Sequence, residues 1–166
     1  MNALLPEALL AAGDVCGELL RARGETVATG EGSCGGLIST ALLAVPGASA
    51  YFLGGSVIYT RRALDGLLTG QVERPAKLRG ASEPWVMHLA DAARIHIGAT
   101  WGIGEGGATG PSGNPYGDPA GHAWVGVSGP VDASRHVLTG DNDRAANMLA
   151  FAIAGLDLFA DTLRSA

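Results

Sequence analysis

The chain has 166 residues, of which 47% are hydrophobic and 16% charged, and its formal net charge is −5. This length allows a full hydrophobic core, so we expect residues 1–166 to form a single domain. The negative charge disfavours nucleic-acid binding, which needs a basic patch. No stretch approaches the ~18 uninterrupted apolar residues of a membrane span, and Met1–Pro6 lacks the basic region of a signal peptide. We therefore expect a cytoplasmic protein without a membrane partner.

Helical and strand patterns alternate through the first part of the chain. Apolar residues at steps of three and four predict a helix over 3–23, which Gly24 ends. The Gly54–Gly55 pair predicts a bulge or a close backbone approach within a strand. The other elements expected here are a strand over 25–32, a helix over 35–45, the strand over 50–60 that holds this pair, and a helix over 61–70 closed by Gly70.

The second part continues the alternation and adds an antiparallel hairpin. Ser82 is a good N-cap for a helix over 84–97. Strands are expected over 99–104, 122–129 and 134–140, the last two joined through Gly129–Pro130, and a final helix over 141–163. This order predicts an α/β fold with a mixed sheet and helices on both of its faces.

Residues 102–121 are unusually rich in glycine, and we expect a long loop there. Gly102, Gly104 and Gly107 match G-x-G-x-x-G, but a dinucleotide-binding turn must open a helix. Two prolines that follow prevent a helix at this point. The stretch can instead hold an anion on its backbone N–H groups, or it is a plain flexible loop.

Side chains that could bind a metal ion are scattered along the chain. His88 and Asp91 share one face of the helix predicted over 84–97, but a metal site needs three or four convergent ligands. We therefore expect no metal and no cofactor. His122 and His136 are expected to face each other across the late hairpin, as a packed pair rather than an acid–base couple.

The segment Gly30–Ser39, GEGSCGGLIS, places a serine and a cysteine before two glycines and a hydrophobic run. Gly35 and Gly36 permit a sharp turn, and the following helix directs free N–H groups toward it. Such a turn can lower the pKa of a thiol or supply an oxyanion hole for acyl transfer. Ser33 and Cys34 are therefore candidate nucleophiles. Alternatively, Ser33 only caps the helix and Cys34 is a buried spacer.

Five short segments match one known family pattern in order along nearly the whole chain. They are EGSCGGLI at 31–38, VPGASAYFLGGSVIYT at 45–60, RGASEP at 79–84, GATGPSG at 107–113 and GDNDR at 140–144. The pattern runs approximately E-S-C-T-G-G-L-I, V-P-G-S-S, G-G-x-x-x-Y-[ST], G-A-V-S-E, G-x-A-G-P and G-D-R. The chain thus resembles the CinA C-terminal domain family, which includes nicotinamide-nucleotide amidohydrolases. The resemblance implies a three-layer α/β/α sandwich and a homodimer.

The resemblance also implies an activity, hydrolysis of the carboxamide of nicotinamide mononucleotide with release of ammonia. In the family, the serine of E-S-C-T-G-G acts as nucleophile and a lysine after the Y-[ST] element acts as its base. Here Glu31, Tyr59 and Thr60 match the family pattern. Gly32 stands at the serine position, however, and Leu64 stands at the lysine position. A one-residue slip would bring the neighbouring serine to the nucleophile position.

Two functions from different classes follow. The first is a diverged amide hydrolase for a small carboxamide nucleotide, with Ser33 or Cys34 as nucleophile, assisted by Tyr59 and Thr60. The second is a catalytically inactive member that binds a nucleotide or another small molecule in a regulatory role. For either function the expected ligand contacts are Glu31, Gly35, Gly36, Arg61, Gly107, Thr109, Gly110 and Ser112.

A usable base near position 64 would separate the two functions, and the sequence offers none. Arg61 or Arg62 could replace the positive charge of the family lysine, but a guanidinium stays protonated and is a poor general base. Glu31 and Glu105 could support the residues of the site without contacting the ligand themselves, or each could be a solvated carboxylate.

Overall fold

The computed structural model describes residues 4–68 and 72–166. Five strands form one mixed sheet in the order β2–β1–β3–β4–β5. β1 pairs in parallel with β2 and β3, whereas β4 pairs antiparallel with β3 and β5. The strands are β1 Val27–Glu31, β2 Phe52–Val57, β3 Trp101–Ala108, β4 His122–Ser128 and β5 Ala133–Leu138.

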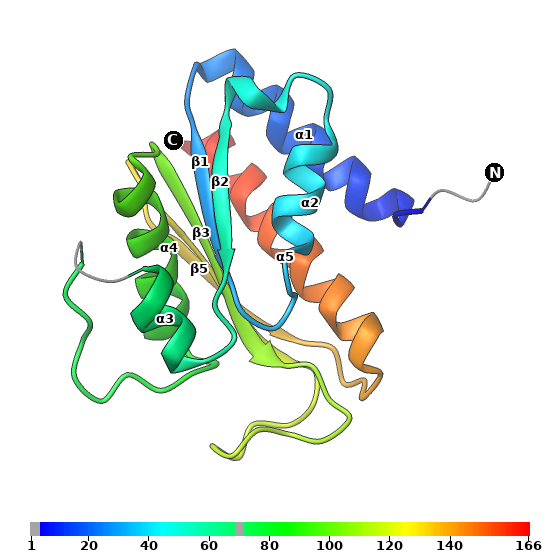
Figure 1. Cartoon of the computed structure of the whole chain (residues 1–166). Helices are drawn as coiled ribbons and strands as arrows, with labels where there is room; N and C mark the ends of the chain where they lie inside the picture. Colours follow the sequence, from blue (N-terminus) through cyan, green and yellow to red (C-terminus); the bar gives the residue numbers. More distant parts are fainter. Residues whose placement is uncertain (1–3, 69–71) are drawn as a thin grey trace.

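Helices cover both faces of the sheet, as Figure 1 shows. One face carries α1 (Glu7–Arg23), α2 (Leu37–Ala44) and α5 (Arg144–Ser165), over the larger hydrophobic core. The other face carries α3 (Arg61–Leu67) and α4 (Glu83–Ile97), over a smaller core. A short 3₁₀ helix, η1 (Ala48–Ala50), precedes β2. The fold is therefore the expected three-layer α/β/α sandwich with a mixed sheet.

Local signals in the sequence set most of the element ends. Gly24 ends α1 in the left-handed conformation, with φ +64°. Ser82 caps α4 by accepting a hydrogen bond from the backbone N–H of Trp85. Gly70, the expected end of the helix over 61–70, and Ala3, the first residue of the helix predicted over 3–23, lie outside the described residues.

Most expected element ends differ from the observed ones by a few residues, and the largest difference concerns β3. The loop predicted over 102–121 begins only at Thr109, because β3 continues to Ala108. The reason is the close packing of α4 on this strand. A Cβ atom on Gly102 or Gly104 would lie 1.9 Å from a backbone carbonyl oxygen of α4. The glycines of the G-x-G-x-x-G match therefore let a helix approach a strand, and they do not open a dinucleotide-binding helix.

The glycine pair Gly54–Gly55 lies in β2, where the sequence predicts a bulge or a close backbone approach. The β1–β2 register shifts just before Gly54, whose φ is +149°. A Cβ atom on Gly55 would lie 2.1 Å from Thr29 Oγ1 and 2.5 Å from Ser39 Oγ. Both predicted alternatives, an irregular register and a close approach, are thus found, and the missing Cβ of Gly55 leaves room for the hydroxyls of Thr29 and Ser39 between β1 and α2.

Helix α5 is, among the described helices, the one whose length and composition would suit a membrane span. More than half of its apolar window is buried inside the protein, and it packs against α1, α2 and β4. It is a core helix of the sandwich.

Candidate functional site

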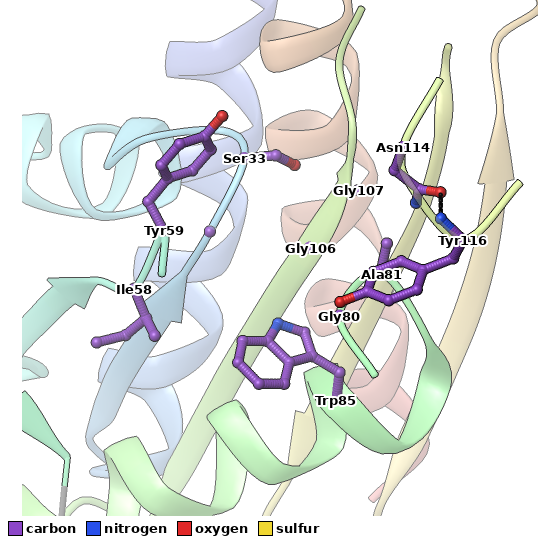
Figure 2. A pocket seen from close by; sticks show the side chains of 11 residues that line it. Ser33, Ile58, Tyr59, Gly80, Ala81, Trp85, Gly106, Gly107, Asn114 and Tyr116 are labelled. Carbon is purple, nitrogen blue, oxygen red and sulfur yellow. Dashed lines mark hydrogen bonds between the residues drawn. The ribbon is translucent and has the colours of Figure 1, made fainter. Parts of the chain in front are cut away.

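A pocket of about 180 Å³ lies where the parallel strands β1 and β2 end, beside the last residues of β3. Open α/β sheets commonly bind ligands at the carboxyl ends of their strands. Figure 2 shows the aromatic rings of Tyr59, Trp85 and Tyr116 around this pocket, together with Ser33. The remaining lining residues are Gly32, Ile58, Gly80, Ala81, Gly106, Gly107 and Asn114.

Ser33 lies on the turn between β1 and α2, and its hydroxyl donates a hydrogen bond to Glu105 Oε1 on β3. The other carboxyl oxygen of Glu105 accepts hydrogen bonds from the backbone N–H groups of Gly32 (3.1 Å) and Cys34 (2.9 Å). Glu105 is fully buried. Burial raises its pKa above the usual range, although the bonds from Cys34 and Ser33 oppose the rise.

Cys34 faces away from the pocket, into the core beneath α2. Its thiol donates a hydrogen bond to Glu31 Oε1 at 3.1 Å. Burial, and the nearby carboxylates of Glu105 and Glu31, raise the pKa of this thiol well above its usual value. The pKa shift is thus opposite to the one that a helix N-terminus alone predicts. Of the two candidate nucleophiles, the structure brings Ser33 to the pocket and leaves Cys34 protonated behind it.

Glu31 holds the beginning of α2 in place. Its carboxylate accepts hydrogen bonds from the backbone N–H groups of Ile38 (2.7 Å) and Ser39 (2.9 Å) and from the hydroxyl of Ser39 (2.5 Å). The glycines Gly35 and Gly36 form the tight turn before the helix, with φ +67° and +96°. Glu31 is fully buried, so it is not a solvated carboxylate. It and the two glycines are absent from the lining of the pocket.

The segment after β2 contributes one of its three expected site residues to the pocket. Tyr59 lines it and is 64% exposed. Thr60 instead caps α3 by accepting a hydrogen bond from the N–H of Ala63 at 3.1 Å. Arg61 donates a hydrogen bond to the carbonyl of Leu78 at 3.0 Å. Both therefore hold the chain around α3 rather than facing the cavity.

Leu64, the residue that the resemblance matches to the family lysine, is a core residue. Leu64 is 3% exposed and packs in the smaller core, which also contains Ile58 and Trp85. The chain has a single lysine, Lys77, which is exposed and does not line the pocket. No lysine base is therefore available at this site.

A second, more polar cavity of about 230 Å³ adjoins the first one and shares Tyr59, Gly107 and Asn114 with it. It contains the expected loop residues Gly107, Thr109, Gly110 and Ser112. Its wall also includes Arg144, which donates hydrogen bonds to the carbonyl of Gly110 (2.7 Å) and to the hydroxyl of Tyr59 (3.2 Å). Arg144 is not among the ligand contacts expected from the sequence, although the GDNDR match contains it.

The loop after β3 supplies Asn114 and Tyr116, which are also absent from the contacts expected from the sequence. Asn114 Oδ1 accepts the backbone N–H of Tyr116 at 3.1 Å. Arg79 lies over the ring of Tyr116, 5.2 Å from its centroid, and forms an ion pair with Asp118 at 2.6 Å. The hydrogen bond from Arg79 lowers the pKa of Asp118 to about 2. These contacts tie the loop to the segment before α4.

The two histidines of the late hairpin contact each other, as expected. His136 Nε2 lies 2.9 Å from His122 Nδ1, and His122 Nε2 lies 2.8 Å from the carbonyl oxygen of Ala81. The pair therefore packs beside the segment that lines the pocket. Within residues 4–68 and 72–166, no three His, Cys, Asp or Glu side chains gather as a metal site requires.

Comparison with known proteins places the chain among CinA proteins. The model of the CinA C-terminal domain matches residues 11–163. A CinA-like protein of Anaeromyxobacter sp. strain K is 40% identical over 134 residues, which cover 80% of this chain and 33% of that protein. One of Salinibacter ruber is 37% identical over 146 residues, covering 86% and 35%. This chain thus spans about a third of the length of these relatives.

Solved structures show the same fold. A CinA superfamily protein from Klebsiella pneumoniae superposes with a TM-score of 0.86 at 23% identity, over 95% of this chain and 99% of that one. The competence/damage inducible protein CihA from Agrobacterium tumefaciens gives 0.86 at 24% identity, over 98% and 99%. With the family model and the relatives above, this agreement shows that the chain belongs to the CinA C-terminal domain family.

Proposed function

We propose that this protein hydrolyses the amide bond of a small carboxamide nucleotide, such as nicotinamide mononucleotide, with Ser33 as the nucleophile. The observation that carries the proposal is the place of Ser33. Among the described residues that line the pocket, it is the one with an aliphatic hydroxyl or thiol. Its hydroxyl donates a hydrogen bond to a buried carboxyl group, as an activated nucleophile does.

The shape and lining of the two cavities support this class of substrate. Three aromatic side chains and the bare backbone of Gly106 and Gly107 suit a flat aromatic ring in the first cavity. The indole ring of Trp85 lies against Gly106, and in Figure 2 its nitrogen is on the side that faces Ser33 and Tyr59. That N–H can donate a hydrogen bond to a carboxamide oxygen. Arg144 in the adjoining cavity suits a phosphate group.

The second candidate function is ligand binding without catalysis. The observation in its favour is Leu64, which occupies the position of the family base and is buried in an apolar cluster. Under this alternative the same two cavities hold the same class of nucleotide, and the ligand leaves unchanged.

The experiment that separates the two functions measures ammonia release from nicotinamide mononucleotide. We expect turnover by the wild-type protein and at least a ~100-fold loss in Ser33→Ala, because no other described residue that lines the first cavity has an aliphatic hydroxyl or thiol. Cys34→Ala should stay within a few fold of wild type, since its thiol is protonated and outside the pocket. Calorimetry on S33A should still detect binding of the nucleotide. Binding by wild type without ammonia release would leave the non-catalytic function.

A further inference from the structure

Glu105 is a buried carboxyl group that the family pattern does not explain. It is fully buried, and no cationic side chain of the described residues pairs with it. Its partners are instead the hydroxyl of Ser33 and the backbone N–H groups of Gly32 and Cys34. Burying a carboxylate without a cation is costly, so such groups are found more often at functional sites than elsewhere.

The geometry gives the two oxygens of Glu105 different tasks. Oε2 is held by the N–H groups of Gly32 and Cys34, which stand on either side of Ser33. Oε1 is left to accept the hydrogen bond from Ser33 Oγ. The β1–β3 pairing fixes the arrangement, since it places Glu31 opposite Glu105 and thus the turn after β1 directly over this carboxyl group. One oxygen is anchored while the other faces the nucleophile.

We propose that Glu105 is the general base that activates Ser33, in place of the lysine that acts in the family. The inference rests on the proposed amide hydrolysis, and it names the group that takes and returns the proton. Burial supports it, because a carboxyl group with a raised pKa is a stronger base than an ordinary glutamate.

The proton balance of the reaction is simple. As Ser33 Oγ bonds to the amide carbon, its proton moves to Glu105 Oε1. The tetrahedral intermediate then expels the amide nitrogen, which takes that proton and leaves as ammonia. Water attacks the Ser33 ester and passes a proton to Glu105, which returns it to Ser33 Oγ as the carboxylic acid leaves. The net change is amide plus water to acid plus ammonia.

A purely structural role for Glu105 makes a different prediction. Glu105→Gln has nearly the same shape, and its amide oxygen can still accept the bonds from Gly32 and Cys34. Its NH₂ group can donate to Ser33 Oγ, so the turn stays held while the base is lost. If Glu105 only fixes the turn, E105Q should keep a reactive serine. If it is the base, E105Q should not.

The test uses a fluorophosphonate, which reacts with an activated serine by losing fluoride and needs no amide substrate. Peptide mass spectrometry measures the rate of Ser33 labelling in the full chain. We expect labelling in wild type and a drop of at least ~100-fold in E105Q, the usual scale of general-base catalysis. The matched control Glu73→Gln changes an exposed glutamate outside the pocket and should label at the wild-type rate.

The pH dependence of Ser33 labelling gives a second readout, which uses only the wild-type protein and so does not require that E105Q folds. In wild type, the labelling rate should rise with pH through one ionisation above the ordinary glutamate pKa of about 4.5 and then level off. Equal labelling of E105Q and wild type, no labelling of Ser33, or a flat pH profile would each overturn the assignment. Labelling that depends on Glu105 without ammonia release would instead keep the base and reject the proposed amide substrate.

Discussion

At the residue scale, the site depends on one contact, the hydrogen bond that the hydroxyl of Ser33 donates to the buried carboxyl group of Glu105. Ser33 could be proposed from its neighbours alone, because two glycines and a helix follow it directly. Glu105 lies on a different strand, and the parallel register of β1 and β3 brings it to Ser33. The sequence therefore suggested Glu105 only as a residue that could support the site, because spacing along the chain does not show its contact with Ser33, whereas turns and caps depend on neighbouring residues.

The raised pKa of Glu105 predicts a pH dependence of stability. The folded state holds this proton more tightly than the unfolded chain, for which the pKa is about 4.5. The group therefore stabilises the fold below that pH, and the contribution is lost as pH rises through the folded pKa. E105Q has no titrating group here and does not lose this contribution. We therefore expect the difference in free energy of unfolding, E105Q minus wild type, to grow as the pH rises from the unfolded to the folded pKa of Glu105. The growth should be about 1.4 kcal/mol for each pH unit between these two pKa values. Urea unfolding at a series of pH values measures the free energy of unfolding of both proteins. If this free energy changed with pH in the same way for wild type and E105Q, the result would contradict a raised pKa of Glu105.

At the scale of elements, the contact between β3 and α4 decides the shape of the site. Gly102 and Gly104 let α4 approach the sheet closely, and Trp85 at the start of that helix then lies against Gly106 beside the pocket. The sequence placed these two glycines both at the end of a strand expected over 99–104 and at the start of a loop expected over 102–121. It could not show that they face a helix, because the helix comes from a separate stretch of the chain.

Gly104→Ala tests this contact. Its Cβ would lie 1.9 Å from the carbonyl oxygen of Val86, so the helix must move, and we expect a loss of about 3 kcal/mol in the free energy of unfolding. Gly66→Ala is the matched control, since Gly66 lies in α3 with no atom within 4 Å of the added methyl group. It should be neutral or stabilising by up to about 1 kcal/mol. Equal effects of the two substitutions in urea unfolding would refute the close packing of α4 as the reason for these glycines.

At the scale of the whole molecule, the site is assembled from segments far apart in sequence. The β1–α2 turn, the end of β2, the start of α4, the loop after β3 and the first residue of α5 meet at one end of the sheet. The family resemblance predicted the fold, and four of the residues expected to contact a ligand, Gly107, Thr109, Gly110 and Ser112, line the second cavity. It did not predict that Thr60 and Arg61 face away, since α3 turns them toward its own backbone and toward Leu78.

Arg144 joins these segments, and its charge predicts ligand selectivity. Arg144→Ala should weaken binding of nicotinamide mononucleotide about tenfold or more, because an ionic hydrogen bond to phosphate is lost. Binding of nicotinamide riboside, which has no phosphate, should change much less. Arg62→Ala removes an exposed arginine that lines neither cavity and should alter neither affinity. Calorimetry compares the two ligands; an equal loss for both would mean that Arg144 only holds the loop.

A single-turnover experiment tests most directly whether Ser33 cleaves an amide in a pocket that has no lysine. Protein in excess over nicotinamide mononucleotide reveals even slow chemistry, because every bound nucleotide is followed to its product. We predict one ammonia and one nicotinic acid mononucleotide for each nucleotide consumed by wild type, with no conversion by S33A. Recovery of the nucleotide unchanged, or equal conversion by S33A, would contradict the proposed role of Ser33.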